Sequence, residues 1–284
     1  MVRVDTQVHV VSRDHARYPL NPPAMDVPRW FELHGRTVEE LLEEMDAVGI
    51  DRAVLVQGFS AYQYDNRYTA DSAASCPERL ACACIADIND DPLERVRYWV
   101  GERHARAIRF FLQLDSDAAW LDSRASDDVF VELQRRGAIA QTALVAEQLP
   151  ALLRAAERHR GLSFLLDHCG FSDFSGGDDY PNARALFALA SAPNVHVKIS
   201  NHVWHLASSA GLRPPSVTRA LVQSFGAERV MWASDLTVHD RDYADLIAEA
   251  EAACVDLTDA QRMLVLGDAA AALWWPQDRN ARAE

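Results

Sequence analysis

The chain has 284 residues, of which 49% are hydrophobic and 25% charged, and its formal net charge is −14. This composition is typical of a folded globular protein and excludes a disordered chain. The excess of acidic residues argues against a nucleic-acid partner, which requires clustered lysine and arginine. No apolar run approaches about 20 residues and the N-terminus lacks a signal-peptide pattern, so we expect a cytoplasmic protein without a membrane partner that acts on a small molecule.

The first patterned segment is Asp5–Val10, in which polar and apolar side chains alternate as in a strand. One face of this strand would carry Arg3, Asp5, Gln7 and His9, and the other Val4, Val8 and Val10. Burying polar groups without partners costs about 1 to 3 kcal/mol each. We therefore predict that the polar face lines a cavity and that this strand opens an active site.

Helix and strand patterns then alternate along the chain. A capping-box pattern at Thr37–Glu40 begins a helix that Gly49 ends. Further strands are predicted at 52–57, 80–86, 106–111, 138–143, 163–168, 195–200 and 229–234. Further helices are predicted from Asp91 and Pro92 onwards and at 126–136, 146–159, 179–190, 215–226 and 240–253. The irregular segments 12–35 and 112–125 are too long for tight turns, and we expect them to cap the mouth of the fold or an interface.

Eight strands separated by helices favour parallel pairing through right-handed crossovers. We therefore predict an α/β protein built as a single (β/α)8 TIM barrel, with one domain over residues 1–284. An open doubly wound sheet is the alternative, although no GxGxxG motif follows the first strand. Assembly into a homo-oligomer is left open.

Catalytic groups of such barrels lie at the C-terminal ends of the strands. The predicted strand ends carry Gln7, His9, Arg109, His168, Lys198 and Asp235. Two histidines, His202 and His205, follow the seventh strand in a predicted loop, where polar side chains often contact ligands. We predict a catalytic set of Asp235, His168 and His9, and a substrate-binding set of Gln7, Arg109, Lys198, His202 and His205.

Several of these residues have a structural alternative. Asp235 could cap the next helix, Arg109 could serve a structural ion pair, and Lys198 could pair with Asp5 inside the barrel. The five cysteines show no CxxC pair, and buried packing is the expectation for all of them. A nucleophilic thiol is the sharper alternative for Cys169, which directly follows a candidate histidine.

The chain resembles a known family at these positions. The segment Asp5-Thr6-Gln7-Val8-His9 resembles the Asp-x-His-x-His opening of the amidohydrolase superfamily. Further segments resemble its lactonase-like (amidohydrolase-2) branch, namely 107–109, 166–170, 197–200, 230–235 and 266–270. The sequence departs from the family at Gln7, which replaces the first histidine of the pair, at Thr237, where proline is usual, and at Asn201-His202, where glycine is common.

The resemblance implies a hydrolase that opens a lactone or similar cyclic ester of a small carboxylated, hence anionic, substrate. In this reading Asp235 activates water, His9 and His168 polarise the carbonyl, Gln7 donates to the oxyanion, and Arg109 holds the carboxylate.

The cofactor is predicted to be either none or one divalent metal, zinc or manganese, held by His9, His168 and Asp235. Gln7 puts that metal in doubt, because its neutral amide oxygen is a weaker donor than imidazole. Two other readings stay open: a metal-dependent decarboxylase of an aromatic acid, and a catalytically degraded barrel that only binds a ligand.

Overall fold

Eight parallel strands form the centre of the structure, a computed structural model that describes residues 2–113, 118–177, 179–238 and 240–276. The strands follow one another in chain order around the sheet: β1 (Val4–Val8), β2 (Arg52–Val56), β3 (Leu80–Ile85), β4 (Ala107–Phe111), β5 (Ile139–Ala143), β6 (Phe164–Leu166), β7 (Val195–Ser200) and β8 (Val230–Ala233). The first and last strands lie side by side, because Thr6 Oγ1 donates to the carbonyl oxygen of Trp232 (2.6 Å) and Asp235 N to that of Gln7 (3.0 Å). The predicted (β/α)8 barrel is confirmed.

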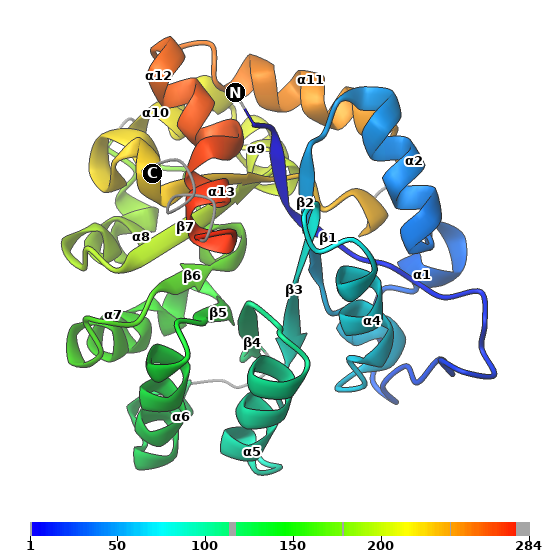
Figure 1. Ribbon diagram of the computed structural model, residues 1–284. Helices are drawn as coiled ribbons and strands as arrows, with labels where there is room; N and C mark the ends of the chain where they lie inside the picture. The colour runs from blue at the N-terminus through cyan, green and yellow to red at the C-terminus, as the bar shows by residue number, and fades with distance from the viewer. Residues whose placement is uncertain (1, 114–117, 178, 239, 277–284) are drawn as a thin grey trace, which may run out of the picture.

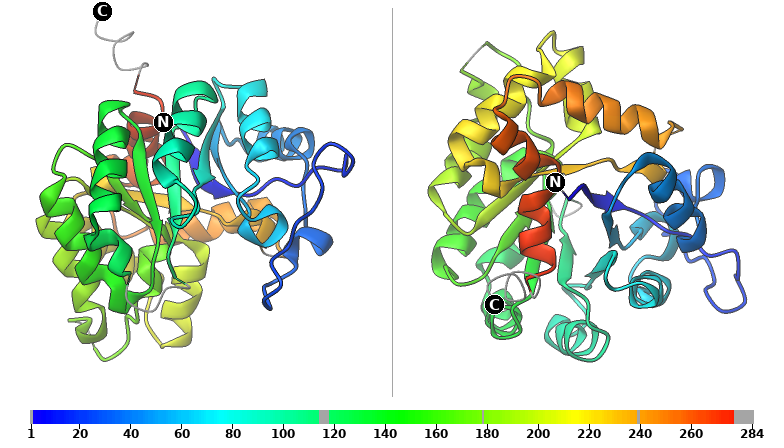
Figure 2. Two further views of the ribbon diagram at one scale, coloured as in Figure 1. Left: turned by 90° about the horizontal axis from the view of Figure 1, so that it is seen from below. Right: turned by 45° about the horizontal axis from the view of Figure 1, so that its top comes forward.

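Helices surround the strands (Figure 1 and Figure 2). They are α1 (Trp30–Leu33), α2 (Val38–Val48), α3 (Phe59–Tyr62), α4 (Arg67–Ser75), α5 (Pro92–Val96), α6 (Arg124–Arg135), α7 (Leu149–Arg158), α8 (Arg184–Ala188), α9 (Asn201–Ser209), α10 (Pro214–Phe225), α11 (Tyr243–Ala253), α12 (Asp259–Met263) and α13 (Ala269–Trp274). None of these described helices is long and apolar enough to cross a membrane.

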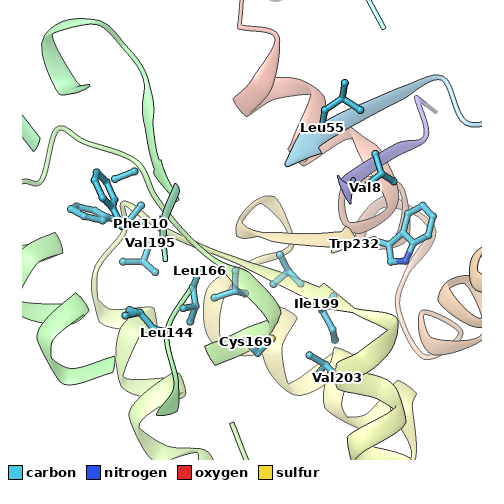
Figure 3. Close-up of a cluster of buried hydrophobic side chains, with 14 of the residues drawn as sticks. Val8, Leu55, Phe110, Leu144, Leu166, Cys169, Val195, Ile199, Val203 and Trp232 are labelled. Carbon is cyan, nitrogen blue, oxygen red and sulfur yellow. The ribbon is translucent and has the colours of Figure 1, made fainter. Parts of the chain in front are cut away.

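Apolar side chains fill two separate layers. The larger layer lies between the strands and the helices, and it includes Val8, Leu55, Phe110, Leu166 and Ile199 (Figure 3). The smaller layer fills the barrel where the strands begin, with Val4, Val54, Ala107, Leu165 and Met231 packed against Trp274. Helix α13 therefore covers this end of the barrel (Figure 1). A cavity opens at the opposite end, where the strands finish.

The predicted faces of the first strand are wrong in one respect. Val4 packs inside the barrel, whereas Val8 and Val10 pack in the outer layer, because the pairing of β1 with β2 shifts register between Asp5 and Val8. An irregularity of this kind reverses the direction of the side chains that follow it. Asp5 consequently meets Tyr243 of the outer helix α11, while Gln7 and His9 line the cavity at the open end.

The segment after β7 is helix α9, although the sequence predicted a loop there. Its buried residues Val203, Trp204 and Ala207 recur at helical spacing, and Trp204 Nε1 donates to Thr218 Oγ1 (3.0 Å). The helix predicted at 179–190 is α-helical only over α8. The predicted capping box at Thr37 and the left-handed Gly49 at the end of α2 are both confirmed.

The irregular segment 12–35 caps the mouth, as expected, because Met25, Pro28 and Trp30 line the cavity there. Of the second irregular segment, residues 114–117 lie outside the described residues. Gln113, just before them, also lines the cavity.

Candidate active site

A cavity of about 380 Å³ opens where the strands end. Its polar lining includes Gln7, His9, Arg109, His168, His202 and Asp235, and its apolar wall includes Trp30, Phe59, Phe111 and Phe171. The structure thus brings six of the eight predicted site residues to one cavity. A small number of polar groups within an apolar wall is typical of a small-molecule site.

Gln7 lies at the centre of the polar groups. Its Oε1 accepts a hydrogen bond from Lys198 Nζ (3.0 Å), and its Nε2 lies 3.0 Å from His168 Nε2 and 3.5 Å from Asp235 Oδ1. A lysine ammonium can only donate, so the amide cannot turn its NH2 group towards Lys198. The amide hydrogens of Gln7 are therefore directed at His168 and Asp235.

The Gln7 contact also settles the tautomer of His168. Since Nε2 accepts from the amide, the hydrogen is on Nδ1, which donates to Ser200 Oγ (2.9 Å). Burial lowers the pKa of His168 against the opposing effect of the Asp235 and Asp167 charges. The imidazole is thus neutral near pH 7, and both of its nitrogens have partners.

A left-handed turn after β6 presents His168 to the cavity. The φ angles are 49° at His168, 52° at Cys169 and 63° at Gly170, a conformation that costs a residue with a side chain about 1 to 2 kcal/mol. Ser172 Oγ donates to the Cys169 carbonyl oxygen (2.8 Å) and helps to hold the turn. In a strand, neighbouring side chains point in opposite directions. The turn instead lets the neighbours Asp167 and His168 both contact site residues at the same end of the barrel.

His9 is held at both edges of its ring. Its Nδ1 lies 2.7 Å from the carbonyl oxygen of Val56 and therefore carries a hydrogen, and its Nε2 lies 3.4 Å from Asp235 Oδ1. The ring also stacks on Trp30, with 5.1 Å between centroids. His9 can therefore exchange a proton with Asp235 through Nε2 without moving its ring.

Asp235 follows β8 with a φ of 58°, and its carboxylate lies between Gln7 and His9 at the cavity wall. The next long helix, α11, begins only at Tyr243. The alternative that Asp235 caps this helix is therefore wrong.

Beneath the cavity lies a buried cluster of charges. Asp167 accepts from Arg109 Nε (2.8 Å), Lys198 Nζ (3.1 Å) and Gln141 Nε2 (2.8 Å). Burial alone would raise the pKa of Asp167, but the charges of Lys198 and Arg109 lower it to about 2. Burial lowers the pKa of Lys198, and the charge of Asp167 opposes this effect. Asp167 was not in the predicted site, although it directly precedes His168.

Arg109 forms the structural ion pair that was one of its two predicted roles, and it also lines the cavity. Its Nε serves the ion pair with Asp167, its guanidinium lies over Phe111 at 5.1 Å, and the side chain lines the cavity. Within the described residues only Nε takes part in a hydrogen bond. The two terminal nitrogens are the part of the fork that can meet a ligand.

Two predicted substrate-binding residues do not line the cavity. Lys198 is fully buried and pairs with Asp167 and Gln7 instead of Asp5, which the irregularity in β1 turns outwards. His205 lies on the outer face of α9 with 70% of its side chain exposed, 3.9 Å from Glu249. His202, one turn earlier, does line the cavity and contacts Phe171 edge to face.

The alternative of a nucleophilic Cys169 is contradicted. Its thiol is fully buried, is absent from the cavity wall and donates to the carbonyl oxygen of Lys198 (3.4 Å). Burial raises its pKa, which disfavours the thiolate.

Sequence reasoning missed the aromatic wall of the cavity. Phe111 had a signal, because it lies two residues after Arg109 on the same face of β4. Trp30 and Phe59 belong to short helices in irregular segments, where the sequence has no hydrophobic periodicity to indicate which way a side chain points.

The residues as arranged do not fit a resident metal ion. The lone pair that His168 Nε2 would give to a metal already accepts from the Gln7 amide, which Lys198 holds in place. Within the part of the chain that the structure describes, no three His, Cys, Asp or Glu side chains are placed to hold an ion. Two members of the predicted metal-binding set of His9, His168 and Asp235 are thus in contact with the Gln7 amide instead.

Comparison with known proteins decides the family. The family model described as Amidohydrolase matches residues 4–274. The chain belongs to the amidohydrolase family. This finding confirms the resemblance predicted from the sequence, and the protein is a hydrolase.

One curated relative of this amidohydrolase is an L-fucono-1,5-lactonase of Burkholderia ambifaria, 29% identical over 218 residues that span 72% of this chain and 73% of the relative. A Pseudomonas putida structure named for 2-pyrone-4,6-dicarboxylic acid hydrolysis has a TM-score of 0.77 at 23% identity, over 96% of this chain and 97% of the other. A Burkholderia multivorans amidohydrolase crystallised with bound zinc has a TM-score of 0.75 at 24% identity, over 97% and 99%. At these identities the two structures establish the fold.

Proposed function

We propose that this amidohydrolase opens a lactone, or a similar cyclic ester, of a small anionic substrate with a water molecule activated by Asp235. The observation that carries the proposal is the placement of the Asp235 carboxylate at the cavity wall between the Gln7 amide and His9 Nε2. The similarity to a lactonase and to a protein named for pyrone hydrolysis supports this choice of bond.

Asp235 is the general base of the proposed reaction. It takes a proton from water as the water attacks the ring carbonyl carbon, and the ring C–O bond then breaks. His9 Nε2 lies 3.4 Å from the same carboxylate and can relay the proton to the leaving ring oxygen. Opening the ring in this way yields one hydroxyl group and one carboxylic acid, which ionises to a carboxylate and releases a proton to solvent.

The Gln7 amide is the proposed donor to the developing oxyanion. Its contact with Asp235 is long at 3.5 Å, whereas that with His168 is 3.0 Å. A substrate oxygen between Gln7 and Asp235 can therefore take over the weaker of the two hydrogen bonds. His168, which the sequence suggested as a carbonyl polariser, would instead orient the amide.

Arg109 is the proposed partner of a substrate carboxylate, because it lines the cavity and its terminal nitrogens make no hydrogen bond among the described residues. A guanidinium fork suits bidentate pairing with a carboxylate. The aromatic wall would then cover the ring of the substrate.

A metal has no step in this proposal, because the arrangement of Gln7, Lys198 and His168 does not fit one. Protein purified without added metal should contain well under one zinc or manganese per chain, and a chelator should leave the hydrolysis rate unchanged. Elemental analysis together with assays after chelation checks this. One tightly held zinc per chain would contradict it.

A lactone panel tests the function. It should include 2-pyrone-4,6-dicarboxylate, L-fucono-1,5-lactone and neutral lactones, with proton release as the readout. Hydrolysis of at least one carboxylated lactone, lost in Asp235→Asn, is the expected result. Release of carbon dioxide from aromatic acids would favour the decarboxylase reading, and binding without turnover would favour the degraded barrel.

A further inference from the structure

A second cavity, of about 660 Å³, lies at the end of the barrel where the strands begin. Its walls come from α4, the starts of β3 and β4, the end of α6 and the end of α13. The described residues that line it include none of those that line the catalytic cavity, and Trp274 in its wall is fully buried in the barrel layer, with Lys198 Nζ 6.0 Å from the ring centroid. The cavity is thus distinct from the site proposed for hydrolysis.

The charge of this cavity differs from that of the whole chain. Its lining includes Arg103, Arg106, Arg135, Arg136 and His104, and the described residues that line it include no acidic side chain, in a chain of net charge −14. Two carboxylates behind the wall offset part of the charge: Asp71 pairs with Arg103, and Glu132 is shared by Arg135 (2.8 Å) and Arg136 (2.7 Å). The cavity therefore keeps an excess of positive charge.

Arg106 is a half-buried cation in the wall of this cavity. Its Nε donates to the carbonyl oxygen of Trp274 (3.1 Å), and it has no carboxylate partner among the described residues. Burial lowers the pKa of this guanidinium. A half-buried cation without a counter-charge is costly, and a bound anion would compensate it.

The backbone around the cavity has unusual features. His104 has a φ of 58°, and it follows a π-helical turn at Arg97–Glu102, a feature often found at functional sites. A Cβ at Gly101 would lie 2.1 Å from Arg136 Nη1, so only glycine lets this guanidinium lie against the wall. Trp274 Nε1 is buried without a hydrogen-bond partner among the described residues.

The apolar part of the wall defines the rest of the ligand. Ala70, Ala73 and Ala74 of α4 present small side chains, and Trp275, over whose ring the Arg52 guanidinium lies at 5.0 Å, also lines the cavity. We propose that this cavity binds a small organic anion whose carboxylate groups pair with Arg106 and its neighbouring arginines and whose flat apolar body lies against α4 and Trp275. The site is independent of the hydrolysis proposed at the opposite end.

The test uses phthalate, a flat dicarboxylate, and protein labelled with 5-fluorotryptophan. Substitutions Trp275→Phe and Trp30→Phe assign the ¹⁹F resonances that report the two ends of the barrel. Phthalate should shift the Trp275 resonance in a saturable way, whereas its neutral diamide should not. Inorganic phosphate should act only at higher concentration, because it lacks the apolar body, and tighter binding of phosphate would contradict an organic ligand.

Variants locate the site. Arg106→Gln should weaken the phthalate response of Trp275 about tenfold or more, as expected for the loss of a charged hydrogen bond. Arg154→Gln, which removes an exposed charge paired with Asp122 outside the cavity, is the matched control and should leave the response unchanged. If Arg106→Gln does not fold, Arg135→Gln tests the site instead. The Arg135 side chain is 63% exposed, and its replacement too should weaken phthalate binding. A Trp275 resonance that does not shift with phthalate, or equal affinities for phthalate in all these variants, would overturn the proposal.

Discussion

Gln7 determines the character of the active site at the scale of single residues. The family resemblance leads one to expect histidine at this position, yet the amide takes a hydrogen bond from Lys198 and offers its own hydrogens to His168 and Asp235. Lys198 therefore holds the Gln7 amide, and we expect it to act on the cavity only as a positioning residue. The sequence identified Lys198 but not its partner, because the irregularity in β1 could not be read from the residue pattern.

The substitution Asp235→Asn should leave the fold intact and lower the rate of lactone hydrolysis by about 10²- to 10⁴-fold, the usual contribution of a general base. An isosteric amide cannot accept the proton of water. Thermal melting controls for folding, and steady-state rates give the effect. Near-normal turnover by this variant would exclude Asp235 as the base.

The substitution Arg109→Lys should raise KM for a carboxylated lactone about tenfold and change KM for a neutral analogue much less. A lysine keeps the charge that faces Asp167 but cannot offer a fork to a carboxylate. Comparing KM for the two substrates gives the result. Equal losses for both would leave Arg109 with a purely structural role.

At the scale of elements, the sequence predicted all eight strands to within a few residues, because the first shows a strand-like alternation and most of the others are short apolar runs between helical patterns. It did not predict the left-handed turn after β6, which places His168 at the cavity and depends on Ser172 and on packing against α7. It also missed α9, whose polar first turn looked like a loop. Local pattern thus predicted the barrel, whereas tertiary contacts decided how several site residues point.

Gly170 provides a test of this turn. Its φ is 63°, and a Cβ there would meet Leu149 Cδ2 at 2.8 Å, whereas Gly137 has the same φ with nothing within 4 Å. We expect Gly170→Ala to cost about 2 to 4 kcal/mol in the free energy of unfolding and to lower kcat, because both strain and overpacking apply.

The matched variant Gly137→Ala should cost only about 1 kcal/mol and leave kcat unchanged, because it introduces backbone strain alone. Denaturant titrations of both variants measure the difference. Equal costs would show that the turn relaxes without disturbing Leu149.

At the scale of the whole molecule, the two ends of the barrel differ in what fills them. The end where the strands begin is closed by apolar side chains and Trp274, and the end where they finish holds the buried charges of Arg109, Asp167 and Lys198 beneath the cavity. Arg109 and Lys198 share the single carboxylate of Asp167, so replacing Asp167 would leave both cations uncompensated. The charged end therefore depends most on Asp167.

Histidine titration should control the acid stability of the barrel. Burial, with a smaller effect of the Arg229 charge, lowers the pKa of His196 to about 4, so between about pH 6.5 and 4 the unfolded chain binds more protons than the folded one. The free energy of unfolding should fall as the pH decreases through this window, with His196 contributing up to about 3 kcal/mol.

The variant His196→Asn should make this pH dependence shallower. His205→Asn removes a histidine whose side chain is 70% exposed, and it is the matched control that should keep the original slope. Urea titrations at a series of pH values measure both. A slope unchanged by His196→Asn would show that another group dominates acid unfolding.

Incorporation of ¹⁸O tests the central claim most directly. A carboxylated lactone that the enzyme turns over is incubated in ¹⁸O-labelled water after chelation, and the product is analysed by mass spectrometry. We expect one ¹⁸O atom per product in the new carboxylate with the wild-type enzyme, no carbon dioxide, and almost no product with Asp235→Asn. Product without the label, loss of turnover on chelation, or equal product from both proteins would contradict hydrolysis by water activated at Asp235.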